Sequence, residues 1–499
     1  MEEYSSRFSN YWNNPFLLLC PHRNGHLRLV QTALKEYVGA MNEHCVNIVI
    51  AGASGYIGKA VMPKLLERFP EAQITAIARS RQESNDPRIT WRSCDLFSLK
   101  SLEQALPPRI DLAIYLVHSM GPTAHLDQGS FADYDLILAD NFARAVRRSG
   151  IRQIIYLGGI IPQAEKISLH LTSRLEVENT FNQYGLPLTV FRAGLILGEQ
   201  GSSFQILLKL VQRLPFMICP HWTQTLTSPV DLDTVLNAIA TAALEPGHTG
   251  KIYDLAACRP LTYVDMMSET ARKMGKRRRF LPVPFFTPTL SRLWVSLITN
   301  TPKNLVYPLV ESLEHPMVAR EDHLFSRAGL DKSYFDLLDE VSLRIKPGSS
   351  FFRFKANSGT VRSIQRLPLP PGRDAQWVMD QYLQWLPRYL SPFIKAKVDG
   401  ARVRFSVFAA RPVLLELELS RERSSDDRVL LYITGGWLAS RHDRGRLEFR
   451  VTRDGQSVLA AIHEFRPSLP WFIYTLTQAR LHLLVMHAFA RHLGKHAAT

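Results

Sequence analysis

The fold is decided by one stretch near the start of the chain, Val46-Asn47-Ile48-Val49-Ile50-Ala51-Gly52-Ala53-Ser54-Gly55-Tyr56-Ile57-Gly58-Lys59-Ala60-Val61. Its β-branched first half predicts a buried strand, its glycines predict a tight turn, and its last residues begin a helix. Gly52 gives the turn backbone freedom, Gly55 leaves room for a pyrophosphate, and Gly58 lets the helix pack closely on the strand. The free N–H groups of a helix N-terminus favour phosphate there. The stretch therefore predicts a dinucleotide-binding turn, and a strand-to-helix turn without a ligand is the alternative.

The residue after the second predicted strand, residues 73–78, bears on which dinucleotide binds. A carboxylate about 20 residues past the turn would hold the ribose diol of NAD(H), whereas an arginine accommodates the 2′-phosphate of NADP(H). Arg79 stands at this position and no carboxylate does. The sequence therefore favours NADP(H) over NAD(H), with a solvated surface arginine as the alternative.

Strands and helices alternate regularly through the first half of the chain. Further strands are expected at residues 89–92, 111–117, 152–157 and 187–191, and helices at 131–149 and 170–184. This rhythm predicts an α/β fold with a doubly wound parallel sheet and a ligand across the carboxyl ends of its strands. The residues expected to bind the cofactor at these ends are Gly52, Ser54, Gly55, Tyr56, Ile57, Gly58, Arg79, Asp95, Leu96, Leu116, Val117, His118, Gly158 and Arg174.

Several segments share a pattern with a known superfamily. They are Gly52-Ala-Ser-Gly-Tyr-Ile-Gly58, Tyr115-Leu-Val-His-Ser-Met-Gly121, Ile154-Ile-Tyr-Leu-Gly-Gly159, His170-Leu-Thr-Ser-Arg-Leu-Glu-Val-Glu178, Phe191-Arg-Ala-Gly194, Leu214-Pro-Phe-Met217 and Pro282-Val-Pro284. The pattern resembles the extended and atypical branches of the short-chain dehydrogenase/reductase superfamily, most of all the NmrA-like NAD(P)-binding proteins. The resemblance implies a Rossmann-type domain with a small cap region over residues 46 to about 330.

The catalytic set of that superfamily is altered here. An active reductase of this type carries Tyr-x-x-x-Lys on the helix after the fifth strand, where Tyr handles the carbonyl proton and Lys holds the nicotinamide ribose. His170 and Arg174 stand at these two positions, and Gly158-Gly159 replaces the helper Ser or Thr. His170 is a candidate general acid, and Arg174 is a candidate for gripping the ribose hydroxyls.

Besides a lipid carrier at an anionic membrane that the dinucleotide domain would control, two functions stay open on this basis. One is an NADP(H)-dependent oxidoreductase that acts on an apolar or lipid-like carbonyl or alkene. The other is a catalytically silent NADP(H)-occupied sensor, scaffold or assembly factor, similar to NmrA-like regulators or the reductase-like accessory subunit of respiratory complex I.

The length and composition of the chain indicate the number of domains and the cellular compartment. A chain of 499 residues is too long for one ordinary core, so two or three domains are expected. The five cysteines are scattered without a Cys-x-x-Cys, which favours a reducing compartment and argues against a zinc site. We therefore expect a cytoplasmic protein without a metal, with peripheral contact to the inner face of a membrane as an open alternative.

The last third of the chain forms a separate basic domain in this interpretation. We expect a leader at residues 1–45, the NAD(P)-binding domain at 46–340 and an α+β domain at 341–499. Residues 341–499 contain 25 Lys and Arg against 12 Asp and Glu, which fits an anionic membrane, an acidic protein partner or a solvated arginine-rich surface, and we expect no specific nucleic acid. A strand, a helix, a run of alternating strands and a long final helix at 471–493 resemble the helix-grip fold of lipid-binding domains. That resemblance implies an apolar or lipid-like ligand, with a filled core as the alternative.

Overall fold

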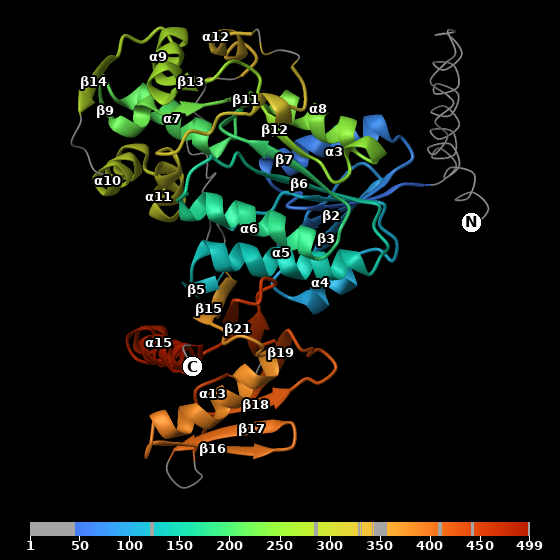
Figure 1. Ribbon diagram of the computed structural model, residues 1–499, viewed down its shortest axis with the longest axis vertical. Helices are drawn as coiled ribbons and strands as arrows, with labels where there is room; N and C mark the ends of the chain where they lie inside the picture. The colour runs from blue at the N-terminus through green and yellow to red at the C-terminus, as the bar shows by residue number, and fades with distance from the viewer. Residues whose placement is uncertain are drawn as a thin grey trace.

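The computed structural model describes residues 45–119, 124–283, 288–327, 330, 332–341, 343, 357–407, 412–440 and 444–497. The expected leader, the segment around residues 344–356 where the domain boundary was placed, and Met120 and Gly121 lie outside the described residues. The described chain forms two parts stacked along the long axis of the molecule, each built on its own sheet (Figure 1).

The first sheet has seven parallel strands in the order β12-β7-β6-β4-β1-β2-β3. The order reverses between β1 and β4, and a crevice at such a reversal is where open α/β sheets bind ligands. The central strands are apolar on both faces, as a sheet covered on both sides requires. The strands are β1 (Asn47–Ala51), β2 (Gln73–Ala78), β3 (Ile89–Ser93), β4 (Leu112–Tyr115), β6 (Gln153–Gly159), β7 (Leu188–Ala193) and β12 (Ile252–Leu255). The predicted Rossmann-type fold is confirmed.

Helices cover both faces of this sheet. On one face, α3 (Tyr56–Arg68) and α8 (Leu232–Ala242) share an apolar cluster with Ile48 and Ile50, and α7 (Ser202–Arg213) joins this cluster from the cap region. The opposite face is covered by α4 (Leu99–Ala105), α5 (Phe131–Arg147) and α6 (Leu169–Gln183). Side chains of Ile364, Leu459 and Ala461 from the second sheet join the same apolar cluster as α5, so α5 lies between the two sheets (Figure 1).

A smaller cap region lies beyond the carboxyl ends of the strands. Its longer elements are α9 (Tyr263–Lys273), α10 (Pro288–Thr299), α11 (Lys303–Ser312), β9 (Phe216–Pro220) and β14 (Arg279–Val283). Its short elements are β8 (Ile196–Leu197), η2 (His221–Gln224), β10 (Leu226–Thr227), β11 (Val230–Asp231), η3 (Pro246–His248), β13 (Leu261–Thr262), η4 (Glu321–His323) and α12 (Tyr334–Leu337). The Asp231 side chain accepts a hydrogen bond from the Thr234 N–H at 2.8 Å, so this residue caps α8.

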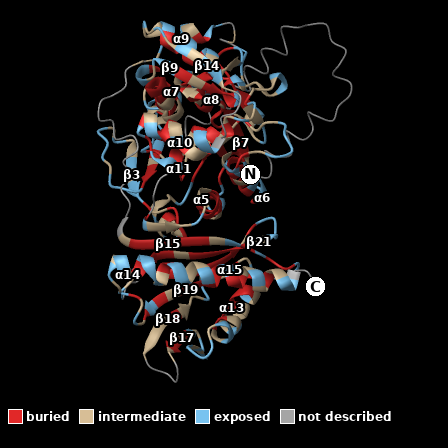
Figure 2. Ribbon diagram, turned by 90° about the vertical axis from the view of Figure 1, so that its left-hand side faces the viewer, coloured by how far each residue is buried: buried red, intermediate tan, exposed pale blue. Residues whose placement is uncertain are grey.

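The second sheet has eight strands in the order β16-β17-β18-β19-β20-β21-β15-β5. Its strands are β5 (Ala124–Gln128), β15 (Asn357–Pro368), β16 (Ile394–Asp399), β17 (Arg402–Val407), β18 (Val413–Leu419), β19 (Arg428–Gly435), β20 (Arg446–Val451) and β21 (Ser457–Phe465). Neighbouring strands are antiparallel except β15 and β5, which are parallel. The sequence did not predict β5, which leaves the first part of the chain just after β4 and becomes the edge strand of the second sheet. Figure 2 shows β15 as a largely buried strand at the junction of the two parts.

The end of the chain differs from the single helix expected at 471–493. The structure has two helices, α14 (Trp471–Leu476) and α15 (Gln478–Ala497), with the non-helical Thr477 between them. The hydroxyls of Thr475 and Thr477 each donate to the carbonyl four residues earlier, and such bonds bend or interrupt helices. Together with α13 (Ala375–Tyr389), α15 packs on the second sheet and forms its apolar core.

Buried ion pairs join the two parts. The Arg450 guanidinium on β20 donates to Asp140 on α5 at 2.5 Å, to Glu448 at 2.6 Å and to the amide oxygen of Asn141 at 2.8 Å. Arg144 on α5 donates to Asp427 of the second part at 2.7 Å. Burial works against the charged carboxylate of Asp140, but the two arginines more than offset it and lower its pKa. The second part is thus bound to α5 by the buried pair of Arg450 with Asp140 and by the partly buried pair of Arg144 with Asp427.

Replacing Arg450 should test this junction. Arg450→Met leaves buried carboxylates with one cation fewer, so we expect the free energy of unfolding to fall by about 3–5 kcal/mol. The measurement is guanidinium denaturation of the full chain. The matched control is Arg402→Met, whose pair with Glu418 is 3.9 Å long and about half exposed, and which should cost under about 1 kcal/mol. Equal small losses for both variants would contradict a structural role for the buried pair.

Candidate functional site

The glycine turn after β1 has the shape that the sequence predicted. Gly52 has φ of +85°, a conformation that side chains rarely adopt, and a Cβ there would lie 3.0 Å from the backbone of Leu116. A Cβ on Gly58 would lie 2.4 Å from the Gly52 carbonyl oxygen, so only glycine lets α3 approach the turn. Gly55 caps α3 without any side-chain hydrogen bond. The first N–H groups of α3 are therefore open to an anion, and this cradle fits a dinucleotide pyrophosphate.

The other predicted cofactor residues lie at the same edge of the sheet. Leu116, Val117 and His118 follow β4 directly beside the turn, and Gly158 lies near the end of β6. Ser54 is exposed on the turn. The ring of Tyr56 packs against Gly198 in the cap region, so only its backbone faces the cradle, together with that of Ile57. The structure thus brings these predicted positions together.

Arg79 and Asp95 lie farther along this edge. Arg79 is exposed after β2, and its guanidinium has no partner among the described residues. Asp95 follows β3, where it accepts 3.1 Å hydrogen bonds from the Phe97 N–H and from Arg362 of the second part. Leu96 is buried beneath it. The adenine end of the predicted site therefore borders the second part of the molecule.

Arg174, one of the two altered catalytic residues, is held by a buried carboxylate on α5 that the sequence analysis missed. Asp135 accepts hydrogen bonds from Arg174 at 2.5 Å, from the Ser119 N–H at 2.7 Å and from the Ser173 hydroxyl at 3.2 Å. Its fourth contact is with Nδ1 of His118 at 2.8 Å. The available signal was the set of acidic residues Asp133, Asp135 and Asp140 along α5, but nothing local showed which neighbouring helix each would face. The guanidinium of Arg174 thus forms an ion pair with Asp135.

The two histidines of this cluster are neutral at neutral pH. The rings of His118 and His170 lie 5.0 Å apart between centroids. Burial, followed by the charge of Arg174, lowers the pKa of His118. Burial, followed by His118 and Arg174, lowers the pKa of His170 well below its ordinary value. A charged His170 that donates a proton at neutral pH, as the sequence suggested, does not fit this surrounding.

An apolar cavity of about 120 Å³ adjoins His170 between the sheet edge and the cap region. Its lining includes Gly159 at the end of β6, Trp222, Tyr263 and Val310. The indole Nε1 of Trp222 is buried and has no hydrogen-bond partner among the residues that the structure describes. Such a donor in an apolar cavity can bind one acceptor oxygen of a small ligand.

The sequence comparisons agree with this geometry. Residues 48–187 match the family described as "NAD dependent epimerase/dehydratase family". This part of the chain is thus similar to the NAD(P)-binding domains of that family. The resemblance to short-chain dehydrogenases and reductases is thereby confirmed for the NAD(P)-binding domain, whereas the helix-grip resemblance of the second part stays a prediction.

Individual relatives cover different shares of the chain. Auxiliary protein GraX of Staphylococcus aureus (strain NCTC 8325 / PS 47) is 32% identical over 114 residues, 22% of this chain. The match spans only 36% of the length of GraX. Quinone oxidoreductase 2 of Escherichia coli (strain K12) is 24% identical over 233 residues, which is 46% of this chain and 75% of that protein.

Among solved structures, triphenylmethane reductase of Citrobacter sp. complexed with NADP(H) has a TM-score of 0.47 at 19% identity, over 59% of this chain and 99% of that chain. The NADPH complex of quinone oxidoreductase QOR2 from Escherichia coli has a TM-score of 0.45 at 19% identity, over the same shares of 59% and 99%. Among the described residues of this protein, we find no helix that is both long and apolar enough to cross a membrane.

The neutral His170 predicts a pH dependence of stability. Its pKa is lower in the folded than in the unfolded chain, so unfolding takes up a proton at low pH. The contribution is fully present above about pH 6.5 and is lost as the pH falls below it, by up to about 1.4 kcal/mol per pH unit for one proton. Urea denaturation between pH 8 and pH 5 should give a shallower loss for His170→Leu than for the wild type. Parallel curves would show that His170 is not held neutral.

Proposed function

We propose that the protein is an NADP(H)-dependent oxidoreductase that reduces a small apolar acceptor of the quinone type. The observation that carries the proposal is the apolar cavity beside His170, which opens at the same sheet edge as the glycine cradle. A cofactor bound across that edge supplies a hydride, and the cavity supplies a dry place for the acceptor.

Each group at the carboxyl edge of the first sheet would bind a different part of NADP(H). The N–H groups at the start of α3 bind the pyrophosphate, and Arg79 binds the 2′-phosphate of NADP(H). Arg79 suits this task because it is exposed and its guanidinium has no competing carboxylate among the described residues. Asp95 and Leu96 border the adenine, while Leu116, Val117, His118 and Gly158 border the half that carries the nicotinamide.

The acceptor half of the proposal follows from the size and chemistry of the cavity. A volume of about 120 Å³ is slightly below that of an engineered cavity of about 150 Å³ that binds benzene, so one ring is the largest rigid group it takes in this shape. The Trp222 N–H can hold one carbonyl oxygen of such a ring. His170 is neutral and Arg174 is bound by Asp135, so the site holds no strong proton donor. A quinone suits it, because the anion left by hydride transfer is conjugated and takes its proton later from water. The name of the Escherichia coli relative, quinone oxidoreductase 2, supports the same class of acceptor.

The alternative of a catalytically silent protein is supported by the same cluster around Asp135. Asp135 holds both Arg174 and His118, which leaves the position of the catalytic pair as a rigid ion pair. On that view NADP(H) stabilises the fold and reports its own concentration to a partner. Turnover separates the two functions.

A second candidate function concerns the apolar cavity of the second part. This cavity of about 160 Å³ lies between the sheet, α13 and α15, and the buried Gln478 Oε1 and His482 Nε2 on α15 have no partner. Its volume is close to that of the benzene-binding cavity of about 150 Å³, so it suits a small apolar ligand with one polar end rather than a whole lipid. Mass spectrometry of the purified protein under native conditions would reveal such a ligand.

Arg79→Ala tests the assignment of the 2′-phosphate. Loss of one charge-assisted contact should weaken NADPH binding by about 1–3 kcal/mol, whereas NADH binding should hardly change. Tryptophan-quenching titrations with the two nucleotides measure both affinities. The nearby exposed Arg81→Ala is the control. Equal weakening for NADPH and NADH would remove the basis for NADP(H) preference.

His170→Ala tests the acceptor site. Wild-type protein loaded with NADPH should reduce single-ring quinones faster than aliphatic aldehydes and ketones. The variant should lose at least about tenfold in kcat/KM while it keeps its NADPH affinity, because His170 lines the acceptor cavity. Leu169→Ala, an exposed neighbour on α6, is the control. Tight NADPH binding without oxidation by any acceptor would favour the silent sensor.

A further inference from the structure

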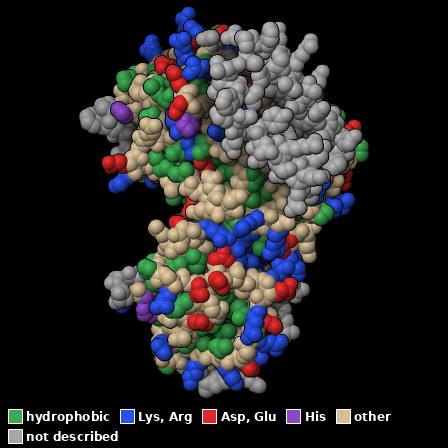
Figure 3. Space-filling model, turned by 45° about the vertical axis from the view of Figure 1, so that its right-hand side comes forward, with side chains coloured by type: hydrophobic (Ala, Val, Ile, Leu, Met, Phe, Trp, Pro, Cys, Tyr) green, Lys and Arg blue, Asp and Glu red, His purple; other side chains and the backbone are tan. Residues whose placement is uncertain are grey.

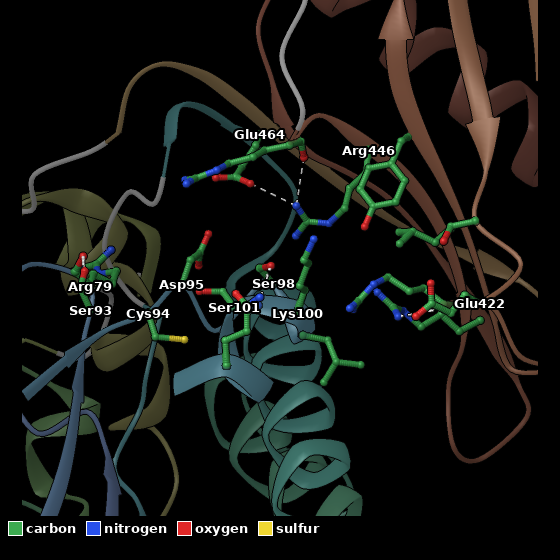
Figure 4. Close-up of a pocket in the computed structure, with 18 residues that line it drawn as sticks. Arg79, Ser93, Cys94, Asp95, Ser98, Lys100, Ser101, Glu422, Arg446 and Glu464 are labelled. Carbon is green, nitrogen blue, oxygen red and sulfur yellow. Dashed lines mark hydrogen bonds and ion pairs between the residues drawn. The ribbon is translucent and has the colours of Figure 1, made fainter. Parts of the chain in front are cut away.

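A cleft of about 900 Å³ lies between the two parts of the molecule, beyond the adenine end of the cofactor site (Figure 4). Arg79 and Ser93 stand at one end of it, Lys100 and the serines of α4 line its floor, and Arg446 and Glu464 of the second sheet lie across from them. A second hollow of about 360 Å³ adjoins it and shares Leu99, Glu422, Arg423 and Arg428. The two hollows form one continuous groove, which we call the interdomain groove.

The interdomain groove is strongly basic. Ten of its lining residues are Lys or Arg, whereas four are Asp or Glu. In the larger hollow the basic residues are Arg79, Lys100, Arg423, Arg428, Arg444 and Arg446. The smaller hollow adds Arg144, Arg147, Arg148 and Arg453. Lys and Arg side chains gather at this junction on the molecular surface (Figure 3).

The cations deep in the groove are neutralised by the protein. Arg428 donates to Glu448 at 2.9 Å, Arg446 to Glu464 at 3.2 Å, and Arg144 to Asp427 at 2.7 Å. These pairs belong to the junction of the two parts and need no ligand.

The cations at the rim of the groove, unlike those deep in it, are mostly not paired with carboxylates in the described part of the chain. Arg79, Lys100 and Arg147 have no hydrogen-bond or ion-pair partner among the described residues. Arg423 has only a 3.6 Å contact with Glu103, and Arg148 donates to that same carboxylate at 2.5 Å. The remaining carboxylates are mostly engaged, since Asp95 pairs with Arg362 and Glu464 with Arg446. The rim thus keeps an excess of positive charge over a recessed space.

We propose that the interdomain groove binds a small ligand that carries phosphate groups, held by Lys100 from the first part and Arg423 from the second. A single carboxylate would leave most of the rim charge unbalanced, whereas a phosphate offers two charges and several acceptor oxygens to Lys and Arg. The recess favours a small molecule over a flat membrane surface. The proposal rests on the proposed function only through Arg79, which the groove shares with the cofactor site.

Two sources can supply the phosphate. It is either the adenosine 2′-phosphate end of NADP(H), with the second part completing the cofactor site, or a separate phosphorylated molecule bound beside the cofactor. The chemistry of recognition is the same for both, and competition distinguishes them.

The experiment titrates the full chain with inorganic tripolyphosphate by isothermal calorimetry. We expect one binding site in the wild type and an affinity at least tenfold lower in Lys100→Gln/Arg423→Gln. The matched control is Lys395→Gln/Arg402→Gln, which removes two exposed cations from the far strands β16 and β17 and should bind like the wild type. Thermal unfolding of each variant verifies that it is folded.

A repeat with NADPH-saturated protein identifies the source. Loss of tripolyphosphate binding assigns the groove to the cofactor's own phosphate, and unchanged binding assigns it to a separate ligand. Absence of binding to the wild type, or equal binding to the groove variant and the control variant, overturns the proposal. Failure of NADPH to bind would refute the proposed function instead, and the titration without nucleotide would still test the groove.

Discussion

Helix α5 can be buried on nearly all sides only because arginines meet its carboxylates. An ionised carboxylate deep in a protein is costly unless a cation and further donors surround it. Asp140 meets Arg450 from the second sheet, and Asp133 meets Arg366 at 2.8 Å from the same sheet. On the opposite side, Asp135 meets Arg174 of the first part. One helix therefore fixes both the position of the second part and the geometry of the altered catalytic pair.

The burial of these arginines gives the excess of Lys and Arg in the last third of the chain a partly structural explanation. Several of its arginines do not face solvent but are buried against the NAD(P)-binding domain, among them Arg362, Arg428, Arg446 and Arg450. Part of the excess charge is thus balanced by acidic residues of the first part. The expectation of an anionic membrane or protein partner for this region stays a prediction, and the charge that remains at the junction lies in a recess.

The sequence predicted features that depend on neighbouring residues, such as the glycine turn. It did not predict contacts between segments that are far apart in the chain. The turn at Gly52 and Gly58 is readable because a Cβ at either position would collide with backbone only a few residues away or on the neighbouring strand. Apolar and polar residues alternate in β16, which is typical of a strand, but the sequence analysis did not predict this strand. In contrast, the role of Asp135 depends on Arg174 from another helix, and no spacing along α5 specifies that neighbour. The motif singled out His170, and its role stays a prediction, but its pKa depends on burial that only the folded chain provides.

The edge strand β5 has a consequence for how the chain folds. It pairs with β15, and the Ser363 hydroxyl bonds to Gln128 across 235 residues of sequence. Contacts of such long range form late, because the loop between them must close first. During synthesis β5 is therefore exposed with an unpaired edge until most of the chain has emerged, and unpaired edges invite association with other chains. The NAD(P)-binding domain thus depends on β15, much later in the chain, to pair with a strand that it makes early, so the folding of the two parts is linked although each has its own sheet.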